Sequence, residues 1–440
     1  MVASSRSGST LALFFDTTTV AMSSRFSLSV LLAGLLIAVS AHAEVPNARP
    51  AVGTPLIQAE ALLKQGRFAE SLDKVREAEK AAADLTRYEL YIVSRTKAAA
   101  AMRAGQTELA IAATEAALAT GHLEGTAQVE LMQSLVNAAY QAKDYARAAR
   151  WAERYAAEGG THPDVAPLRI QALYLAGDHA AAAAALKAKV QVDDAAGRTT
   201  SERELQLLFN AQRKLADAPG MAATLERLAT RYPKPAYWSE LIGRVDLRAL
   251  GDRLRLDLFR LARATGALAD IDAHVALAQL ALHAGFPGEA AGVLDAAADA
   301  GVLVDAGHQA LRDKARKQAA EDNAALKTDL AAARAAKDGN GLAMLGQAAA
   351  AQGRHDLGIP LMEQALARGG LRRADEVTLR LGEAQALAGH GPAAAQTLST
   401  LARGNDGAAA LARLWTLYAT RVPAALTGSP DTRSRPASPA

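Results

Sequence analysis

The chain contains no cysteine, and only 4% of its 440 residues are aromatic. Without cysteine, no disulfide holds the fold together. Neither charge sign is in clear excess, since 49 basic residues face 46 acidic ones. We also find no concentrated basic stripe, so nucleic acid is not an expected partner. What the chain has in abundance is alanine and leucine, both strong helix formers, and this composition favours an all-α protein.

The N-terminal residues 1–43 are predicted to be a secretory signal peptide. A short positive region containing Arg25 precedes an apolar core from Leu28 to Val39, and small residues lead up to Ala43. This three-part order is typical of exported proteins. The apolar core is too short for a comfortable permanent span of a bilayer. We expect cleavage between Ala43 and Glu44, with an uncleaved inner-membrane anchor as the alternative.

The expected location is the periplasm or the exterior, without a stable membrane span after cleavage. The chain has no cysteine to carry the lipid anchor of a bacterial lipoprotein. Residues 1–21 have no clear role, which favours Met22 as the true translation start. Translation from Met1 remains the alternative.

One pattern recurs along the chain at spacings of 34 to 39 residues. Each copy has a turn residue, usually glycine, with a residue that is small in most copies five positions later and, in several copies, another small residue seven positions earlier. The turn positions are Gly66, Gly105, Lys143, Gly177, Ala216, Gly251, Gly285, Ala319, Gly353 and Gly389. Recurrence at this period indicates stacked supersecondary units.

Each unit is predicted to be two antiparallel helices joined by a tight turn. Glycine suits the turn because it tolerates the left-handed conformation that ends a helix. Small residues let the helix axes approach, and larger apolar residues fill the groove between successive pairs. One pair cannot bury its apolar face alone, so the units must stack.

This pattern resembles the tetratricopeptide repeat family over residues 54–421. The resemblance implies an all-α, right-handed superhelical solenoid of antiparallel helix pairs. The charged stretch His308–Lys337 fits less well and could be a lone helix. Because Gly285 and Gly353 are separated by twice 34 residues, we favour a worn repeat that turns at Ala319.

The predicted organisation has five parts: a signal peptide at 1–43, a flexible lead-in at 44–55, N-terminal repeats at 56–233, C-terminal repeats at 234–421 and a disordered tail at 422–440. Residues 409–419 are predicted to be a capping helix, since Leu411, Leu414, Trp415 and Tyr418 follow helical spacing.

A narrower resemblance covers the C-terminal half. The stretches KPAYWSELIG (234–243), ALHAGFPGEAAGVLDAAADAGVL (281–303) and residues 365–398 follow one another, and AALARLWTLY comes after them. Together they resemble exported tetratricopeptide proteins associated with TonB–ExbB–ExbD systems of Gram-negative bacteria. The resemblance implies a periplasmic accessory of energised outer-membrane transport.

We find no catalytic constellation, and neither an enzyme activity nor a cofactor is expected. Ser71 and Lys74 match the S-x-x-K of acyl-serine enzymes, but the K-T-G partner is missing. Ser71 also occupies the small interhelical position, which favours packing. The histidines are scattered without metal-ligand spacing, so no metal site is expected.

A binding surface is the stronger prediction. In such arrays the first helices of the pairs line the concave face. The position after the small residue of each first helix reads Glu60, Ala99, Asn137, Gln171, Asn210, Gln279, Gln347 and Glu383. Five of these eight are side-chain amides, which offer both a donor and an acceptor to an extended peptide. The alternative is a solvated polar position without a partner.

Three residues further along, Tyr140, Tyr174 and Arg213 add aromatic and charged groups. The candidate binding residues are therefore Asn137, Tyr140, Gln171, Tyr174, Asn210, Arg213, Gln279 and Gln347. Trp238 is a second candidate anchor, although packing within the repeat is the favoured interpretation.

The sequence thus predicts a non-catalytic periplasmic scaffold whose partners are envelope proteins or extended peptide segments. An accessory role in a TonB-type transport system is the leading hypothesis. The alternative is an assembly factor that holds enzymes of peptidoglycan or exopolysaccharide synthesis.

Overall fold

The computed structural model describes residues 48–80, 84–268 and 270–421. Within these ranges the regular elements are helices throughout, so the predicted all-α class is confirmed. The predicted signal peptide and the predicted C-terminal tail lie outside the described residues. No helix in the described ranges has the length and apolar character needed to cross a bilayer.

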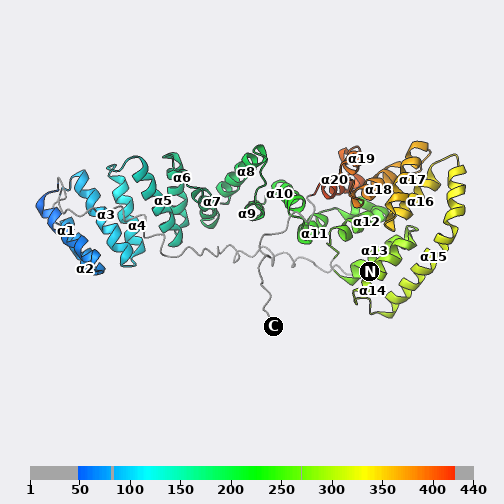
Figure 1. Ribbon diagram of the computed structural model, residues 1–440, viewed down its shortest axis with the longest axis horizontal. Coiled ribbons are helices and arrows are strands. Elements are labelled where there is room, and N and C mark those ends of the chain that lie inside the picture. The colour runs from blue at the N-terminus through cyan, green and yellow to red at the C-terminus, as the bar shows by residue number, and fades with distance from the viewer. Residues whose placement is uncertain (1–47, 81–83, 269, 422–440) are drawn as a thin grey trace, which may run out of the picture. The chain divides into compact units, whose positions relative to one another are not determined.

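The described chain divides into two compact units, residues 48–200 with 206–217, and residues 201–205 with 218–421. The first unit holds α1 (Pro50–Lys64), α2 (Phe68–Lys80), α3 (Arg87–Arg103), α4 (Thr107–Ala119), α5 (Gly125–Gln141), α6 (Tyr145–Ala157), α7 (Val165–Leu175) and α8 (His179–Ala195). Successive helices pair as antiparallel neighbours, as Figure 1 shows. The division between the units passes through α9 (Glu202–Lys214).

The second unit continues the repeat with helices of more varied length. It holds α10 (Ala218–Arg231), α11 (Pro235–Gly243), α12 (Leu247–Ala264), α13 (Ile271–His283), α14 (Pro287–Asp299), α15 (Ala306–Ala335), α16 (Asn340–Ala351), α17 (His355–Arg368), α18 (Ala374–Leu387), α19 (Gly391–Leu398), the 3₁₀ turn η2 (Leu401–Arg403) and α20 (Gly407–Thr420). The predicted boundary between residues 233 and 234 lies inside this unit and stays a prediction about repeat organisation.

The predicted helix-to-helix turns are confirmed at eight of the ten positions, and a ninth, Gly251, breaks the backbone inside α12; all nine have positive φ. Seven are glycines, for which this conformation carries no steric cost. Lys143 and Ala216 adopt it too, with φ of 63° and 54°. The left-handed turn therefore forms at two repeat positions that have no glycine.

The predicted turn at Ala319 is wrong. Residues 306–335 form one uninterrupted 30-residue helix, α15, so the interpretation of this stretch as a lone charged helix is the correct one. Alanine and charged residues around Ala319 are good helix formers, and no glycine offers a low-cost left-handed turn there. The N-terminal half of α15 packs on the α14 cluster and the C-terminal half on the α16–α17 cluster.

Small residues bring paired helices into close contact, as predicted. Ser71 is fully buried, and its hydroxyl donates a hydrogen bond to the Ala59 carbonyl at 2.8 Å, which confirms the packing interpretation. In the α16–α17 pair, a Cβ placed on Gly358 would lie 2.7 Å from the Gly346 carbonyl oxygen. No larger residue fits at that distance without moving the helices apart.

The predicted flexible lead-in at 44–55 is wrong from residue 50 onward, because α1 begins at Pro50. Proline is favoured at the first position of a helix. The preceding residue, Arg49, is held by Glu89 of α3 through a pair of side-chain hydrogen bonds of 3.0 and 2.8 Å. These bonds hold the pKa of the buried Glu89 carboxyl well below its ordinary value, although burial alone would raise it.

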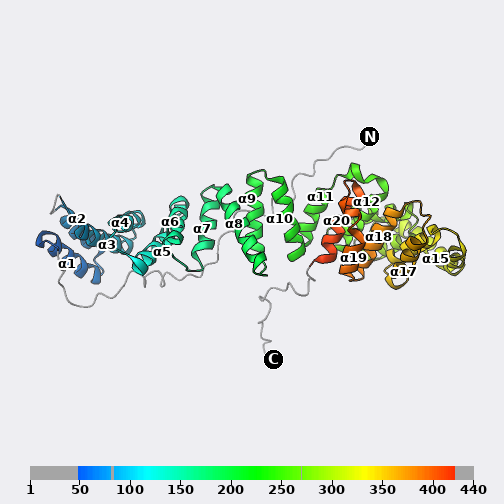
Figure 2. The same cartoon turned by 90° about the horizontal axis from the view of Figure 1, so that it is seen from above.

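The terminal helix α20 folds back within the second unit. It packs against α18 and α19, as a cap would, but also against α10 and α12 (Figure 2). Trp415 is fully buried, and the ring of Tyr418 meets those of Trp415 and Trp238 edge-on, at centroid distances of 5.3 and 6.1 Å. Trp238 is buried as well, which confirms that it packs in the core. The second unit is therefore closed on itself by contacts between its first and last helices.

Candidate functional site

In the first unit, side chains of the predicted row from neighbouring repeats meet. The Tyr140 hydroxyl of α5 donates a hydrogen bond to the Gln171 side-chain oxygen of α7 at 3.1 Å. Asn137, one helical turn before Tyr140, is half-buried, as are Tyr140 and Gln171 themselves. The first helices of adjacent repeats therefore turn these polar groups toward the same side.

The row extends from α7 to α9. Burial raises the pKa of Tyr174, while the nearby positive charge of Arg213 opposes that increase, so the two side chains lie within electrostatic range. Arg213 is exposed. The Asn210 side-chain oxygen is buried and has no hydrogen-bond partner among the described residues. This oxygen can therefore accept a hydrogen bond from a donor group of a bound partner.

The two predicted binding residues of the second unit, Gln279 and Gln347, lie in different surroundings. Gln279 of α13 is exposed. Gln347 of α16 is half-buried, and its side-chain oxygen accepts a hydrogen bond from Arg380 of α18 at 2.8 Å. Gln347 is thus engaged by the chain itself, as part of a larger charged network.

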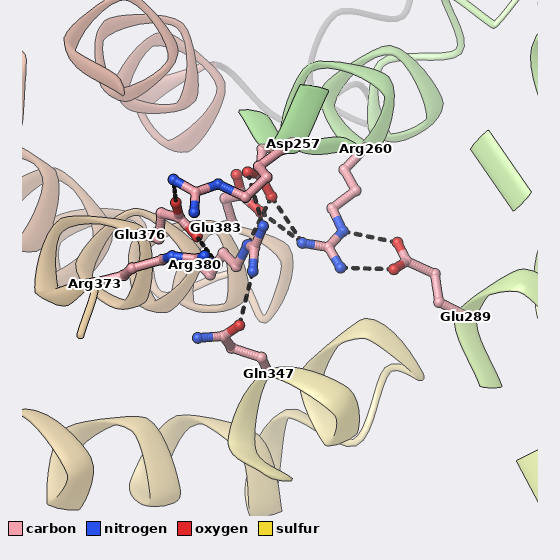
Figure 3. A network of polar contacts seen from close by, with 9 residues as sticks. Asp257, Arg260, Glu289, Gln347, Arg373, Glu376, Arg380 and Glu383 are labelled. Atoms are coloured by element: carbon pink, nitrogen blue, oxygen red, sulfur yellow. Dashed lines mark hydrogen bonds and ion pairs between the residues drawn. The ribbon is translucent and has the colours of Figure 1, made fainter. Parts of the chain in front are cut away.

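That network joins α12, α14, α16 and α18 in the interior of the second unit (Figure 3). Arg260 of α12 donates hydrogen bonds to both carboxylate oxygens of Glu289 on α14, at 2.8 and 2.6 Å. Asp257 of α12 accepts bonds from Arg260 at 2.8 Å and from Arg380 at 3.0 Å. Asp257 is fully buried, and the Phe286 ring lies 5.1 and 5.6 Å from the two guanidinium carbons.

The buried carboxyl of Glu383 completes the network. Its Oε2 lies 3.8 Å from Arg260, whereas its Oε1 is buried without a hydrogen-bond partner among the described residues. Burial raises the pKa of Glu383 well above its ordinary value, and the negative charge of Asp257 raises it further. Arg260 and Arg380 act in the opposite direction. With Glu383 protonated, the positive charges of Arg260 and Arg380 would be matched by the negative charges of Asp257 and Glu289.

The sequence prediction missed this network, although it placed Gln347 and Glu383 in the predicted row. Asp257 and Arg380 each stand between two leucines, in LDL and LRL. A charged residue inside an apolar run is a signal for a buried ion pair, because a lone buried charge is costly. Nothing local in the sequence indicates which partner each would find.

No group of three or more His, Asp or Glu side chains in the described ranges is arranged to hold a metal ion. His355, at the start of α17, has a lowered pKa, mainly through burial, with an opposing contribution from Asp356. It lies near His390, whose charge also lowers that pKa. Both histidines directly follow the turns of adjacent repeats, at Gly353 and Gly389.

Residues 84–254 match the profile of a family described as YfiO, an outer membrane lipoprotein. The match spans less than half of the chain and runs from α3 into α12. No curated protein matches the sequence.

Three solved structures match the chain over most of its length. A tetratricopeptide repeat protein from Parabacteroides merdae ATCC 43184 shares 10% identity, over 76% of this chain and 99% of that one, with a TM-score of 0.25. Naa15/Naa10 bound to HypK-THB shares 16%, over 80% and 63%, with a TM-score of 0.31. The pentatricopeptide repeat protein PPR10 from maize shares 14%, over 88% and 65%, with a TM-score of 0.26. The chain thus spans less than two thirds of the latter two chains.

Proposed function

We propose that this protein is a non-catalytic scaffold of the bacterial cell envelope that binds extended segments of partner proteins along the first helices α5, α7 and α9. The observation that carries the proposal is the hydrogen bond from Tyr140 to Gln171, which aligns polar side chains of consecutive repeats. Amide and hydroxyl groups both donate and accept, so such a row suits the alternating N–H and C=O groups of an extended backbone.

Two independent features support an envelope location. The residue pattern of positions 22–43 is that of a secretory signal. The family matched by residues 84–254 is described as an outer membrane lipoprotein. The chain itself has no cysteine to which a lipid could be attached, so the proposed location is the periplasm and not a lipid anchor.

Within this role, the leading candidate is an accessory of a TonB-type transport system. The ordered resemblance of the C-terminal stretches to exported proteins of such systems supports it. The second candidate is an assembly factor for peptidoglycan or exopolysaccharide enzymes. Neighbouring genes of the ExbB–ExbD kind, or of synthases and hydrolases, would separate the two.

The test is a crosslinking pull-down from envelope extracts with the tagged chain starting at Glu44. Its comparison variant changes Asn137, Gln171 and Asn210 to Ala. We expect the parent chain to capture a defined set of partners and the triple variant to lose it, since each backbone hydrogen bond contributes about 0.5–1.5 kcal/mol to binding.

A matched control changes Arg150, Glu153 and Gln191 to Ala. These residues are exposed on the second helices α6 and α8, so the control should retain every partner. Capture of TonB-system components would favour the first candidate, and capture of synthases or hydrolases the second. If the triple variant keeps all partners, the proposed row is not the binding surface.

A further inference from the structure

Two ion pairs, and a third contact between an arginine and a carboxyl, connect α12 with α18 across the interior of the second unit. Arg253 contacts Glu376 at 2.7 Å, Asp257 contacts Arg380 at 3.0 Å, and Arg260 contacts Glu383 at 3.8 Å. The middle pair is separated by 123 residues in sequence, and the other two pairs have that same separation. Residue numbers therefore rise together along both helices, which run parallel across the pairs.

The signs of the charges fix the register of the two helices. Along α12 the order of the charges is positive, negative, positive, and along α18 a negative Glu376 and a positive Arg380 are followed by Glu383, the carboxyl with the raised pKa. The residues are spaced by four and then three positions, which places them on one face of each helix. A slip by one pair would set Arg253 against Arg380 and would leave the buried Asp257 without its cation from α18.

The outer and inner pairs differ in burial. Arg253 is half-exposed, with 56% of its side chain accessible, whereas Asp257 is fully buried and Arg380 is 10% exposed. For buried pairs, the attraction between the charges is largely offset by the loss of their hydration, so they specify a geometry more than they stabilise it. The closed arrangement therefore depends on a contact that specifies how α12 and α18 fit together but adds little to stability.

Apart from this contact and the packing of α20 on α10 and α12, the two parts of the second unit are connected through the long helix α15 and a small contact between α14 and α16, in which Ala348 packs on the α13–α14 cluster. α12, α13 and α14 precede α15, and α16 to α20 follow it. Only Ala315 and Ala333 of α15 are fully buried, and residues 320–324 in its middle are exposed. Such a helix can bend without disturbing a core.

We propose that the pairs Arg253–Glu376 and Asp257–Arg380 form an ionic clasp that holds the second unit closed, and that the unit opens between α12 and α18, about α15, when the clasp breaks. Opening withdraws α20 from α10 and α12, on which it packs in the closed unit. It also uncovers Phe286 and the charged inner faces of α12 and α18. The clasp is independent of the peptide-binding row proposed for the first unit.

Hydrogen exchange of the full chain tests the clasp through the protection of α20. All variants carry Arg373→Gln, which removes a second cation 3.8 Å from Glu376. In this background, Arg253→Glu and Glu376→Arg each break the outer pair, and the double exchange restores it with reversed polarity. We expect α20 to exchange about two- to fivefold faster in each single variant, as for an exposed pair, and at the parent rate in the double variant.

Breaking the inner pair, Asp257–Arg380, should change the exchange rate of α20 more strongly. Arg380→Gln leaves Asp257 buried without this partner, and we expect exchange of α20 to accelerate about a hundredfold or more. Peptides of α3 to α6 should keep their parent rates in every variant. Unchanged exchange of α20 in the single variants, or a double variant as fast as the singles, would overturn the proposal.

A distance measurement separates opening from local fraying of α20. Because the chain has no cysteine, Arg263→Cys on α12 and Asp375→Cys on α18 allow two spin labels at exposed sites. We expect the distance between the labels to lengthen and broaden when Arg253→Glu is added. If α20 exchanges faster while the distance between the labels stays unchanged, α20 frays locally and the proposed opening is wrong.

Discussion

Glu383 is a buried carboxyl whose environment raises its pKa well above the ordinary value. Burial and the charges of Asp257 and Glu289 raise its pKa, while Arg260 and Arg380 lower it, and the net shift is upward. Its Oε1 has no hydrogen-bond partner among the described residues. The folded protein therefore holds this proton at pH values where the unfolded chain has released it.

This shift predicts how Glu383→Gln changes stability with pH. Between the unfolded pKa, about 4.3, and the raised folded pKa, the unfolded state binds fewer protons, so the free energy of unfolding falls as pH rises. Gln has no proton to lose. We expect Glu383→Gln to be more stable than the parent at pH 7, with the difference vanishing near pH 4. Thermal unfolding at both pH values measures this.

The matched control is Glu289→Gln, which weakens the paired hydrogen bonds from Arg260 at 2.8 and 2.6 Å. Breaking a buried ion pair costs about 3–5 kcal/mol, so this variant should be less stable at pH 7. A Glu383→Gln variant that is also less stable at pH 7 would show that the carboxylate is ionised and needed there.

At the scale of the single element, turns and helices compete for the same alanine-rich sequence. Ala216 ends a helix with φ of 54°, whereas Ala319 lies inside the continuous helix α15. Ala319 matches the 34-residue period at least as well as Ala216 does. The difference arises from packing, because Leu311 and Leu326 of α15 reach two separate apolar clusters that a continuous helix connects.

The same substitution should therefore have opposite effects at these two positions. Ala216→Gly relieves a left-handed alanine and should raise the free energy of unfolding by up to about 1 kcal/mol. Ala319→Gly should lower it by about 1 kcal/mol, the cost of glycine within a helix. Denaturant titrations measure both. A stabilising Ala319→Gly would argue for a turn there after all.

At the scale of the whole molecule, the division into two units determines how the chain unfolds. Each unit has its own buried clusters, with Met132 among those of the first and Trp415 fully buried in the second. Units with separate cores can unfold in separate transitions, so a single melting temperature does not describe the chain.

Trp415→Ala should lower the stability of the second unit alone. Removing a buried tryptophan costs about 3–5 kcal/mol, and α20 loses the residue that packs beside Tyr418. Met132→Ala is the counterpart in the first unit, with an expected cost of about 2–5 kcal/mol. In calorimetry, each variant should lower the temperature of a different unfolding transition. A common shift of all transitions would mean that the units unfold as one.

The sequence by itself determined the helix pairs and nearly all of their turns. The reason is that a turn at Gly66 or Gly353 depends on local backbone freedom and on small residues a few positions away, both of which a repeating pattern records. It also predicted Tyr140 and Gln171 on a common face, since that follows from the register of adjacent repeats.

Only the tertiary structure decided that α15 is continuous, that α20 returns to α12, and that Asp257 meets Arg380. Each of these depends on contacts between segments far apart in the chain, 123 residues for the last pair. A charge between two leucines signals that a partner is needed, because burial of a lone charge is unfavourable. The partner's identity depends on how the stacked repeats curve through space, and no local pattern carries that information.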